Sequence, residues 1–244
     1  MNQLLSKSLA EIVTDQYETA SVFEQFQLDY CCNGKRTLKE ACEEKHISSE
    51  EVLGALQNVY GTKPNKLDFD KIKLSDLADY IVYTHHSYIK KEMPAILTTL
   101  EKVASRHGRR HNELYKIAEL FVTLSNEMAH HVYQEETVLF PRIKLLEQFG
   151  YEPVPFDIRH FQYMELPIID LKDDHEEAGT TMTEIRKLSN NYLPPDDCCT
   201  TFKLLYERLK AFEIDLHHHV YLENSLLFPK ALDLEKELQI KSLS

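Results

Sequence analysis

The chain has 244 residues, with 40 acidic and 28 basic side chains and a formal net charge of −12 at pH 7. A negative field of this kind repels phosphate backbones and anionic lipids, so nucleic acid and membrane surfaces are excluded as predicted partners. Glycine is scarce, with 6 residues, and tryptophan is absent. The many Leu, Glu, Lys, Ala and Gln residues favour helix over sheet. The predicted fold class is all-α.

No apolar run reaches the ~20 residues of a membrane-spanning helix. The first residues, MNQLLSKSLAEIVTDQYETA, contain acidic side chains where a signal peptide keeps its apolar stretch. We therefore expect a cytoplasmic protein. The 5 cysteines of a chain without an export signal indicate thiols or metal ligands rather than a disulfide framework.

Short amphipathic segments fill the first sixty residues. They cover residues 8–17, 20–28, 37–45 and 48–60. The stretch GTKPNKLDFD follows and contains the Gly, Pro and Asn residues typical of a connection. We predict a small helical domain over residues 1–62, a linker over 63–70 and a second domain over 71–244.

The second domain contains four long helical patterns separated by turn-forming stretches. They cover residues 73–104, 111–148, 158–191 and 197–240. Four such helices with short connections predict an antiparallel four-helix bundle. Pro141 and Pro229 fall inside two of these patterns. Because proline inside a helix costs ~3 kcal/mol, a kink or a restart is expected at each.

Two pairs of neighbouring cysteines stand out. Cys31 and Cys32 lie in DYCCNGKR, just before a predicted helix start at Thr37. Ring strain opposes a bridge between neighbouring cysteines, and exposed thiols beside basic residues and a helix start would have a lowered pKa and a raised reactivity. Two ordinary small turn residues are the alternative. Cys198 and Cys199 follow LPPDD at a helix start and are interpreted as structural.

A fourteen-residue stretch occurs twice. HHVYQEETVLFPRI, residues 130–143, returns as HHVYLENSLLFPKA, residues 218–231. Residues four apart share one face of a helix, so His131 aligns with Glu135 and His219 aligns with Glu223. A carboxylate that faces a bundle core needs a partner to offset its desolvation. A metal ion is such a partner.

Each of the other two helices carries one histidine at a matching depth, His86 and His175. The predicted ligand set is therefore four histidines and two glutamates: His86, His131, Glu135, His175, His219 and Glu223. The alternative is a duplicated helical hairpin whose His-x-x-x-Glu pairs are merely stabilising pairs on the surface.

Imidazole and carboxylate ligands in a bundle core suit a pair of iron or manganese ions better than structural zinc. Two six-coordinate ions offer about twelve positions, of which four His, two bridging Glu and one bridging oxygen fill about ten. The open positions would accept O2, NO or water. Acidic side chains are expected to orient the imidazoles by accepting their outer N–H, and the candidates are Glu127, Asp174 and Asp215.

The remaining histidines lie off the ligand face or lack a matching partner, and are interpreted as surface or packing residues. They are His46, His85, His107, His111, His130, His160, His217 and His218. Tyr133 and Tyr221, two positions beyond a ligand histidine, are interpreted as core or helix-contact residues rather than radical sites.

DYCCNGKRTL, followed by a bundle that carries HHVYQEE, DDHEEAG and HHVYLEN, resembles the RIC family, the iron–sulfur cluster repair di-iron proteins of the YtfE/ScdA type. The resemblance spans nearly the whole chain and implies a small ScdA-type domain before a haemerythrin-like bundle. It places the family's six ligands on the six positions above, with both glutamates bridging. Its acidic residues near the metal correspond to Glu127 and to Asp174, where relatives commonly have Glu. Its paired cysteines match Cys31 and Cys32.

The resemblance also implies a cofactor and a function. The cofactor is two non-haem iron ions, bridged by carboxylates and by an oxo or hydroxo group. The function is a stress response that restores iron–sulfur clusters damaged by nitric oxide or peroxide, by donating iron or by reacting with NO. Damaged iron–sulfur proteins, and NO or O2 as small ligands, are the predicted partners.

Other functions stay open at this point. Ordinary haemerythrins carry an additional His ligand that this chain lacks, which argues against simple O2 carriage. An O2- or NO-binding or sensing protein without repair activity is one alternative, and a metal-free interaction bundle is another. The residues do not choose between iron and manganese, between iron donation and nitric oxide reductase activity, or between a monomer and a homodimer.

The bundle's predicted ligands include no sulfur donor. Cys31 and Cys32 are therefore expected to act as a transient iron ligand or as a two-thiol electron source, on an arm that the linker leaves mobile.

Overall fold

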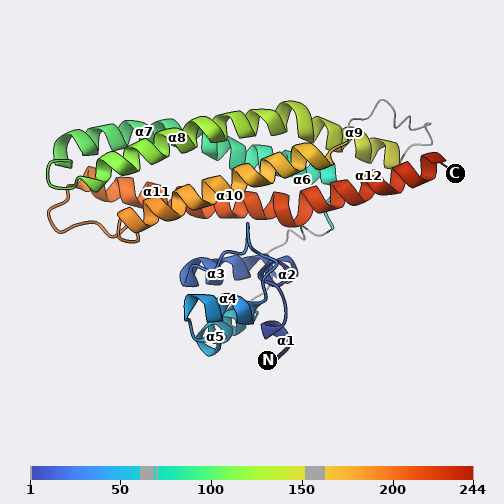
Figure 1. The fold of residues 1–244 in the computed structure, drawn as a ribbon, viewed down its shortest axis with the longest axis horizontal. Coiled ribbons are helices and arrows are strands. Elements are labelled where there is room, and N and C mark those ends of the chain that lie inside the picture. The colour runs from blue at the N-terminus through green and yellow to red at the C-terminus, as the bar shows by residue number, and fades with distance from the viewer. Residues whose placement is uncertain (1, 61–68, 70, 152–162, 244) are drawn as a thin grey trace.

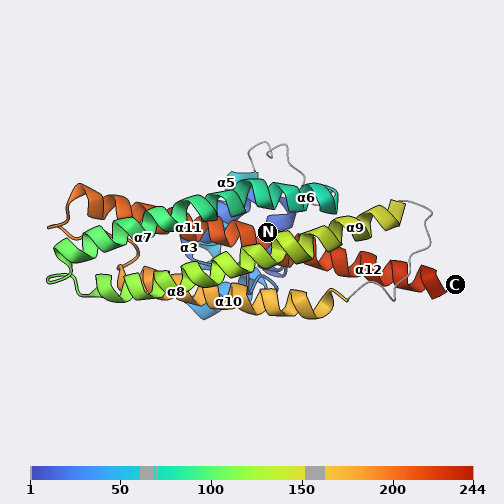
Figure 2. The same cartoon turned by 90° about the horizontal axis from the view of Figure 1, so that it is seen from above.

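The computed structural model describes residues 2–60, 69, 71–151 and 163–243. In these ranges every regular element is a helix and no strand forms, which confirms the all-α class. Four long helical segments run side by side, and the N-terminal helices lie against one side of them near the middle of their length (Figures 1 and 2). None of the described helices combines the length and hydrophobicity that crossing a bilayer requires.

The N-terminal part consists of short helices. They are α1 (Asn2–Leu5), α2 (Leu9–Asp15), the 3-10 turn η1 (Tyr17–Thr19), α3 (Ala20–Phe26), α4 (Leu38–Lys45) and α5 (Ser49–Tyr60). Ser8 and Thr37 begin α2 and α4 with capping boxes, in which each hydroxyl and a glutamate three residues later satisfy free backbone N–H groups. The four predicted segments correspond to α2, α3, α4 and α5, and the predicted helix start at Thr37 is confirmed. Apart from residue 69, the predicted linker 63–70 lies outside the described residues.

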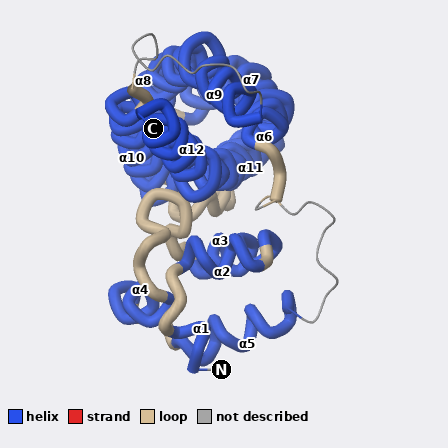
Figure 3. Tube along the Cα trace, turned by 90° about the vertical axis from the view of Figure 1, so that its right-hand side faces the viewer, coloured by secondary structure: helices blue, strands red, loops and turns tan. Residues whose placement is uncertain are grey.

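The bundle consists of four long segments, three of them interrupted by a π-helical turn. The first is α6 (Leu74–Ile81), η2 (Val82–His86) and α7 (Ser87–His107); the second is α8 (Glu113–Gln134), η3 (Glu135–Leu139) and α9 (Phe140–Tyr151); the third is α10 (Glu165–Leu188); the fourth is α11 (Thr200–Tyr221), η5 (Leu222–Leu227) and α12 (Phe228–Leu243). Seen along its axis, the bundle forms a ring in which each segment packs against two others (Figure 3). The start predicted at 158 falls outside the described residues.

The three π-turns change the winding of the bundle where the predicted ligands lie. The backbone N–H of Phe140 bonds to the carbonyl of Glu135, and that of Phe228 to the carbonyl of Glu223, five residues back in each case. The sequence predicts a kink or a restart at the prolines that follow, and the structure instead shows a π-turn just before each. The turn η2 adjoins no proline, so proline is not the common cause. Turns of this kind are frequent at functional sites.

Contacts with α11 and η5 seat the small domain on the bundle. The Thr14 hydroxyl lies 2.8 Å from the hydroxyl of Tyr221, and Glu24 Oε1 lies 2.8 Å from Nδ1 of His217. The ring of Tyr30 packs against Tyr221 with centroids 5.8 Å apart. Tyr221 is thus a buried contact residue, as interpreted from the sequence, whereas the same interpretation is wrong for Tyr133, which is exposed. The residues around the paired cysteines are docked on the bundle in this structure, and the mobility expected of this arm stays a prediction.

Candidate metal centre

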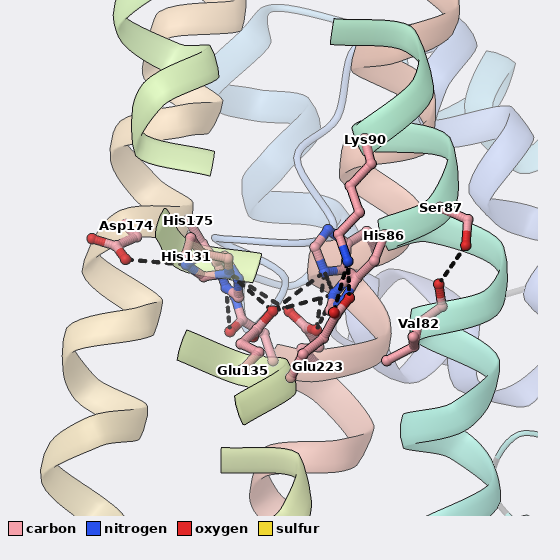
Figure 4. Close-up of polar contacts among 12 residues, drawn as sticks. Val82, His86, Ser87, Lys90, His131, Glu135, Asp174, His175 and Glu223 are labelled. Atoms are coloured by element: carbon pink, nitrogen blue, oxygen red, sulfur yellow. Dashed lines mark hydrogen bonds and ion pairs between the residues drawn. The ribbon is translucent and has the colours of Figure 1, made fainter. Parts of the chain in front are cut away.

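The six predicted ligands meet in the middle of the bundle, and all of them are buried (Figure 4). They form two groups that share both glutamates, and the ligand atoms of each group lie within 4.8 Å of one another. The first ligand group is His86, Glu135, His219 and Glu223; the second ligand group is His131, Glu135, His175 and Glu223.

In the first ligand group, two imidazoles and two carboxylates face a common point. Nε2 of His86 lies 3.2 Å from Nε2 of His219 and 3.3 Å from Oε2 of Glu135. Nε2 of His219 lies 3.0 Å from Oε1 of Glu223. All four side chains therefore present a potential donor atom to one small volume.

The second ligand group repeats this arrangement on the other side of the glutamates. Nε2 of His131 lies 3.0 Å from Nε2 of His175 and 3.3 Å from Oε2 of Glu135. Oε2 of Glu223 lies 3.1 Å from Nε2 of His175. Glu223 thus offers one oxygen to each group, and Oε2 of Glu135 is equally far from His86 and His131. This is the placement that two bridging carboxylates need.

The donor atoms fit a pair of cations better than they fit one another. Three buried carboxylate oxygens, both of Glu135 and Oε2 of Glu223, make no hydrogen bond among the described residues, and Oε2 of each glutamate faces histidine nitrogens only at ion-pair distance. Burying carboxylate oxygens without hydrogen bonds is costly. Two nitrogen ligands at right angles on one ion, with bonds of about 2.1 Å, stand about 3 Å apart. The nitrogen pairs here are 3.2 and 3.0 Å apart.

The charges of the site point the same way. Burial lowers the pKa of His86 and His131, but the carboxylates around them outweigh it and raise the pKa of His86 to about 9 and of His131 to about 10. Burial and mutual repulsion raise the pKa of Glu135, yet the histidines leave it lowered, and the pKa of Glu223 is held well below its usual value. Both carboxylates are therefore ionised at neutral pH and ready to bind positive charge.

Two of the imidazoles are oriented through their outer nitrogen by an acidic side chain. Nδ1 of His131 lies 3.0 Å from Oδ2 of Asp174, as the sequence predicts. Nδ1 of His86 lies 2.9 Å from Oε1 of Glu136, whose carboxylate is held by Lys90 at 2.7 Å. Such a partner fixes the ring so that Nε2 points to the centre.

The sequence reasoning did not identify Glu136, nor Asn224, whose Oδ1 lies 3.1 Å from Nδ1 of His175. A signal for both existed in the repeat. Each of them directly follows one of the two shared glutamates, Glu135 or Glu223, at the same position of the two copies. Each contacts a histidine from a helix outside its own copy, so the pairing depends on how the helices pack.

Two of the predicted orienting acids do not contact a ligand imidazole. Glu127 is exposed. The outer nitrogen of His131, Nδ1, is contacted by Asp174 instead. Oδ1 of Asp215 lies 3.0 Å from Nδ1 of His85, which is not a ligand. The His85 ring stacks on His219 with centroids 5.9 Å apart, so it is a packing residue.

The Leu-Phe-Pro part of the repeat also has a role at the site. The ring of Phe140 stacks on His86 with centroids 5.6 Å apart, and the ring of Phe228 stacks on His175 at 6.1 Å. Both phenylalanines are buried. They fix one imidazole of each ligand group and keep water from its face.

The paired cysteines lie against the metal centre rather than away from it. Sγ of Cys32 lies 3.6 Å from the backbone carbonyl of His175. The side-chain amide of Asn224 donates to the backbone carbonyl of Cys31 at 3.4 Å. Because Asn224 also contacts Nδ1 of His175, one amide side chain links the cysteine turn to a candidate ligand.

The cysteine turn is organised by Asp29. Its Oδ1 accepts the backbone N–H of Cys32 at 2.9 Å and lies 3.4 Å from Sγ of Cys31. Cys31 is buried, and its pKa is raised well above the usual value. The causes are the Cys32 thiol 3.8 Å away, burial and the charge of Asp29. The predicted exposed, acidic thiol is therefore wrong for Cys31. These three side chains nevertheless form a third group whose possible ligand atoms lie within 4.8 Å.

Comparison with known proteins gives two family matches. Residues 5–60 match ScdA_N, described as a domain of unknown function (DUF542). Residues 77–231 match the hemerythrin HHE cation binding domain, and this match covers more than half of the chain.

Curated relatives match along almost the whole length. A probable iron–sulfur cluster repair protein of Haemophilus influenzae is 28% identical over 229 residues, 93% of this chain and 97% of the relative. The iron–sulfur cluster repair protein YtfE of Pectobacterium atrosepticum is 28% identical over 226 residues, 93% and 96% of the two chains. The protein of that name from Salmonella paratyphi B is 29% identical over 224 residues, 92% and 96% of the two chains.

Proposed function

The chain belongs to the hemerythrin HHE cation-binding family, and we propose that it is a non-haem di-iron protein that restores iron–sulfur clusters damaged by nitrosative or oxidative stress. The relatives named as iron–sulfur cluster repair proteins align with 93% of this chain and with 97% and 96% of their own lengths. The resemblance to the RIC family is thereby confirmed, and the activity of this chain is the proposal.

The observation that supports repair is the seating of a thiol pair beside a six-ligand centre. Bound iron would supply a redox-active Lewis acid with positions open to NO or O2. The protein's own part is to hold three of the four imidazoles in place through Asp174, Glu136 and Asn224. Phe140 and Phe228 keep water from two of the rings.

Iron donation is supported by the third group of possible ligands, Asp29, Cys31 and Cys32. The bundle's donors are nitrogen and oxygen, and thiolates are the softer ligands that iron–sulfur chemistry uses. Iron leaving the bundle as cargo would meet these sulfur atoms close to His175. Since burial and neighbouring charge raise the pKa of Cys31, the thiol must lose its proton when it takes a metal.

The test is an anaerobic repair assay on an iron–sulfur dehydratase that has been inactivated with NO. We expect the iron-loaded protein to restore activity faster than free ferrous iron at the same concentration. The Cys31→Ala/Cys32→Ala variant should keep its iron but restore activity several-fold more slowly. Cys42→Ala, which removes a buried cysteine of the same domain, is the matched control and should behave as the parent.

Isotopically labelled iron separates the two routes. Label that moves into the dehydratase indicates iron donation, whereas NO consumption without transfer of label indicates reaction with NO at the centre. A protein that binds iron and NO yet restores nothing would be a binding or sensing module instead. The cytoplasmic location and the iron that the family resemblance implies stay predictions.

A further inference from the structure

Cys199 and His107 form a second chemical site, far from the metal centre. His107 ends α7 and Cys199 immediately precedes α11, at the end of the bundle where these neighbouring helices meet (Figure 1). Cys199 lies twenty residues before His219 along α11, which at the helical rise is about 30 Å. The site is therefore independent of the ligands in the middle of the bundle.

The two side chains are placed as a nucleophile and its base. Nε2 of His107 lies 3.2 Å from Sγ of Cys199. The ring of His107 packs on Phe202 with centroids 5.4 Å apart, and this contact holds it beside the sulfur. A thiol within reach of an imidazole can pass its proton to the ring and react as the thiolate.

The start of α11 and the end of α7 both favour the thiolate. The backbone N–H of Phe202 and, with smaller effect, that of Thr201 lower the pKa of Cys199, and the charge of Arg106 adds to this. The Phe202 N–H donates to the backbone carbonyl of Cys199 at 3.0 Å, and the Cys199 side chain accepts no cap hydrogen bond. A thiolate at a helix start also meets the positive end of the helix dipole.

A cavity of about 480 Å³ opens beside the sulfur. Its lining includes the basic side chains Lys102 and Arg106 and the hydroxyls of Ser105 and Thr201. In a chain with a net charge of −12, this local positive charge selects an anionic molecule.

The acidic group nearest to this turn is already paired. Oδ1 of Asp197 lies 2.9 Å from Nε2 of His111, and its other oxygen lies 3.5 Å from Arg110. The neighbouring Cys198 is half-buried, and ring strain opposes a bridge between it and Cys199. The sulfur of Cys199 is thus left free to react with an outside molecule.

We propose that Cys199 is a site of reversible modification, where a thiolate activated by His107 exchanges with low-molecular-weight disulfides that carry carboxylates, such as glutathione disulfide. The Cys199 thiolate attacks one sulfur of the disulfide, a new sulfur–sulfur bond forms and the old one breaks. His107 takes the thiol proton and returns it to the departing thiolate. One disulfide is consumed and one mixed disulfide and one thiol are formed, so no further oxidant is needed.

The other cysteines provide an internal comparison. Cys42 is buried, and burial raises its pKa. Cys31 is buried too, and its pKa is raised well above the usual value. Cys32 has its sulfur against the carbonyl of His175. The proposal therefore requires Cys199 to react first among the five.

The experiment uses the reduced, iron-loaded full chain and glutathione disulfide, with peptide mass spectrometry to locate the adduct. We expect the first adduct on Cys199, removed by dithiothreitol, and none at that position in Cys199→Ser. His107→Gln should slow the reaction at pH 7, roughly three-fold for each unit by which the thiol pKa rises, because the smaller thiolate fraction is partly offset by a more nucleophilic thiolate. Cys198→Ser is the matched control and should leave the rate unchanged.

Charge selection is tested by comparing glutathione disulfide with the uncharged disulfide of 2-mercaptoethanol. For each disulfide, the rate of its reaction with Cys199 is divided by the rate of its reaction with free cysteine, which corrects for its intrinsic reactivity. We expect a higher ratio for glutathione disulfide, and Lys102→Ala/Arg106→Ala should remove that preference. The proposal is overturned if Cys198 or Cys32 is modified first, if His107→Gln reacts at the parent rate, or if the two disulfides give equal ratios.

Discussion

Glu135 on η3 and Glu223 on η5 come from different helices, yet both belong to both ligand groups. Oε2 of Glu135 lies 3.3 Å from Nε2 of His86 and 3.3 Å from Nε2 of His131. Glu223 faces His219 with one oxygen and His175 with the other. Each glutamate can therefore serve two ions, whereas each histidine can serve one.

This difference predicts unequal losses of iron. Glu135→Leu or Glu223→Leu removes a ligand from both ions, so we expect iron to fall below about one ion per chain. His86→Leu removes a ligand from the first group alone and should leave about one ion per chain. Iron determined by plasma mass spectrometry after gel filtration measures both. Full iron content in the two glutamate variants would falsify the bridging assignment.

Removal of the metal should lower the melting temperature. The apo site keeps two buried, ionised carboxylates, and three of their four oxygens lack a hydrogen bond among the described residues; a bound cation pairs them. At a free metal concentration of 100 times Kd, binding stabilises the folded state by about 2.7 kcal/mol. For a chain of this size that is a shift of about 5–10 °C. Calorimetry of chelator-treated and reloaded protein measures it, and equal melting temperatures would show that the six residues bind no metal.

Asp174 and Glu127 differ in their contact with the imidazoles, and their variants should differ as well. Asp174 contacts Nδ1 of His131 at 3.0 Å, and Glu127 is exposed. Asp174→Asn should weaken iron retention by about 10- to 100-fold, as is usual for a residue that orients a ligand. Glu127→Gln should leave it unchanged. Competition with a chelator gives both affinities, and equal losses would contradict the distinction.

A buried carboxyl away from the metal centre predicts a pH dependence of stability. Glu213 accepts a hydrogen bond from the Tyr192 hydroxyl at 3.1 Å and lies 3.6 Å from Arg186. Burial raises its pKa above the ordinary 4.5 against the opposing effect of Arg186. A raised pKa in the folded state gives stability that is present below the unfolded pKa and is lost as the pH rises through the folded one.

Glu213→Gln keeps an acceptor for Tyr192 and removes this titration. The variant should therefore gain stability relative to the parent as the pH rises from about 4.5 to 8. Urea unfolding of both iron-loaded proteins across this range measures the difference. Glu207→Gln, an exposed position on the same helix, is the control and should follow the parent. A constant difference between Glu213→Gln and the parent would show that Glu213 does not titrate differently in the folded state.

The sequence by itself determined the helices and the face on which the ligands lie. Periodicity is local, so the four-residue step that aligns His131 with Glu135 exists in any helix. The duplicated stretch and one histidine in each other helix were enough to select the six residues that the structure brings together. Capping residues such as Thr37 fixed helix starts for the same local reason.

Contacts between helices were decided only by the tertiary structure. Glu136 orients His86 and Asn224 orients His175 because of how their helices pack, and no spacing within one helix encodes that. The same holds for the cysteines. Their sequence neighbours suggested exposed, acidic thiols, but docking on the bundle buried Cys31, and the Cys32 thiol, desolvation and the Asp29 charge raised its pKa. A pKa depends on all the charges and solvent around a group, and these are set when the chain has folded.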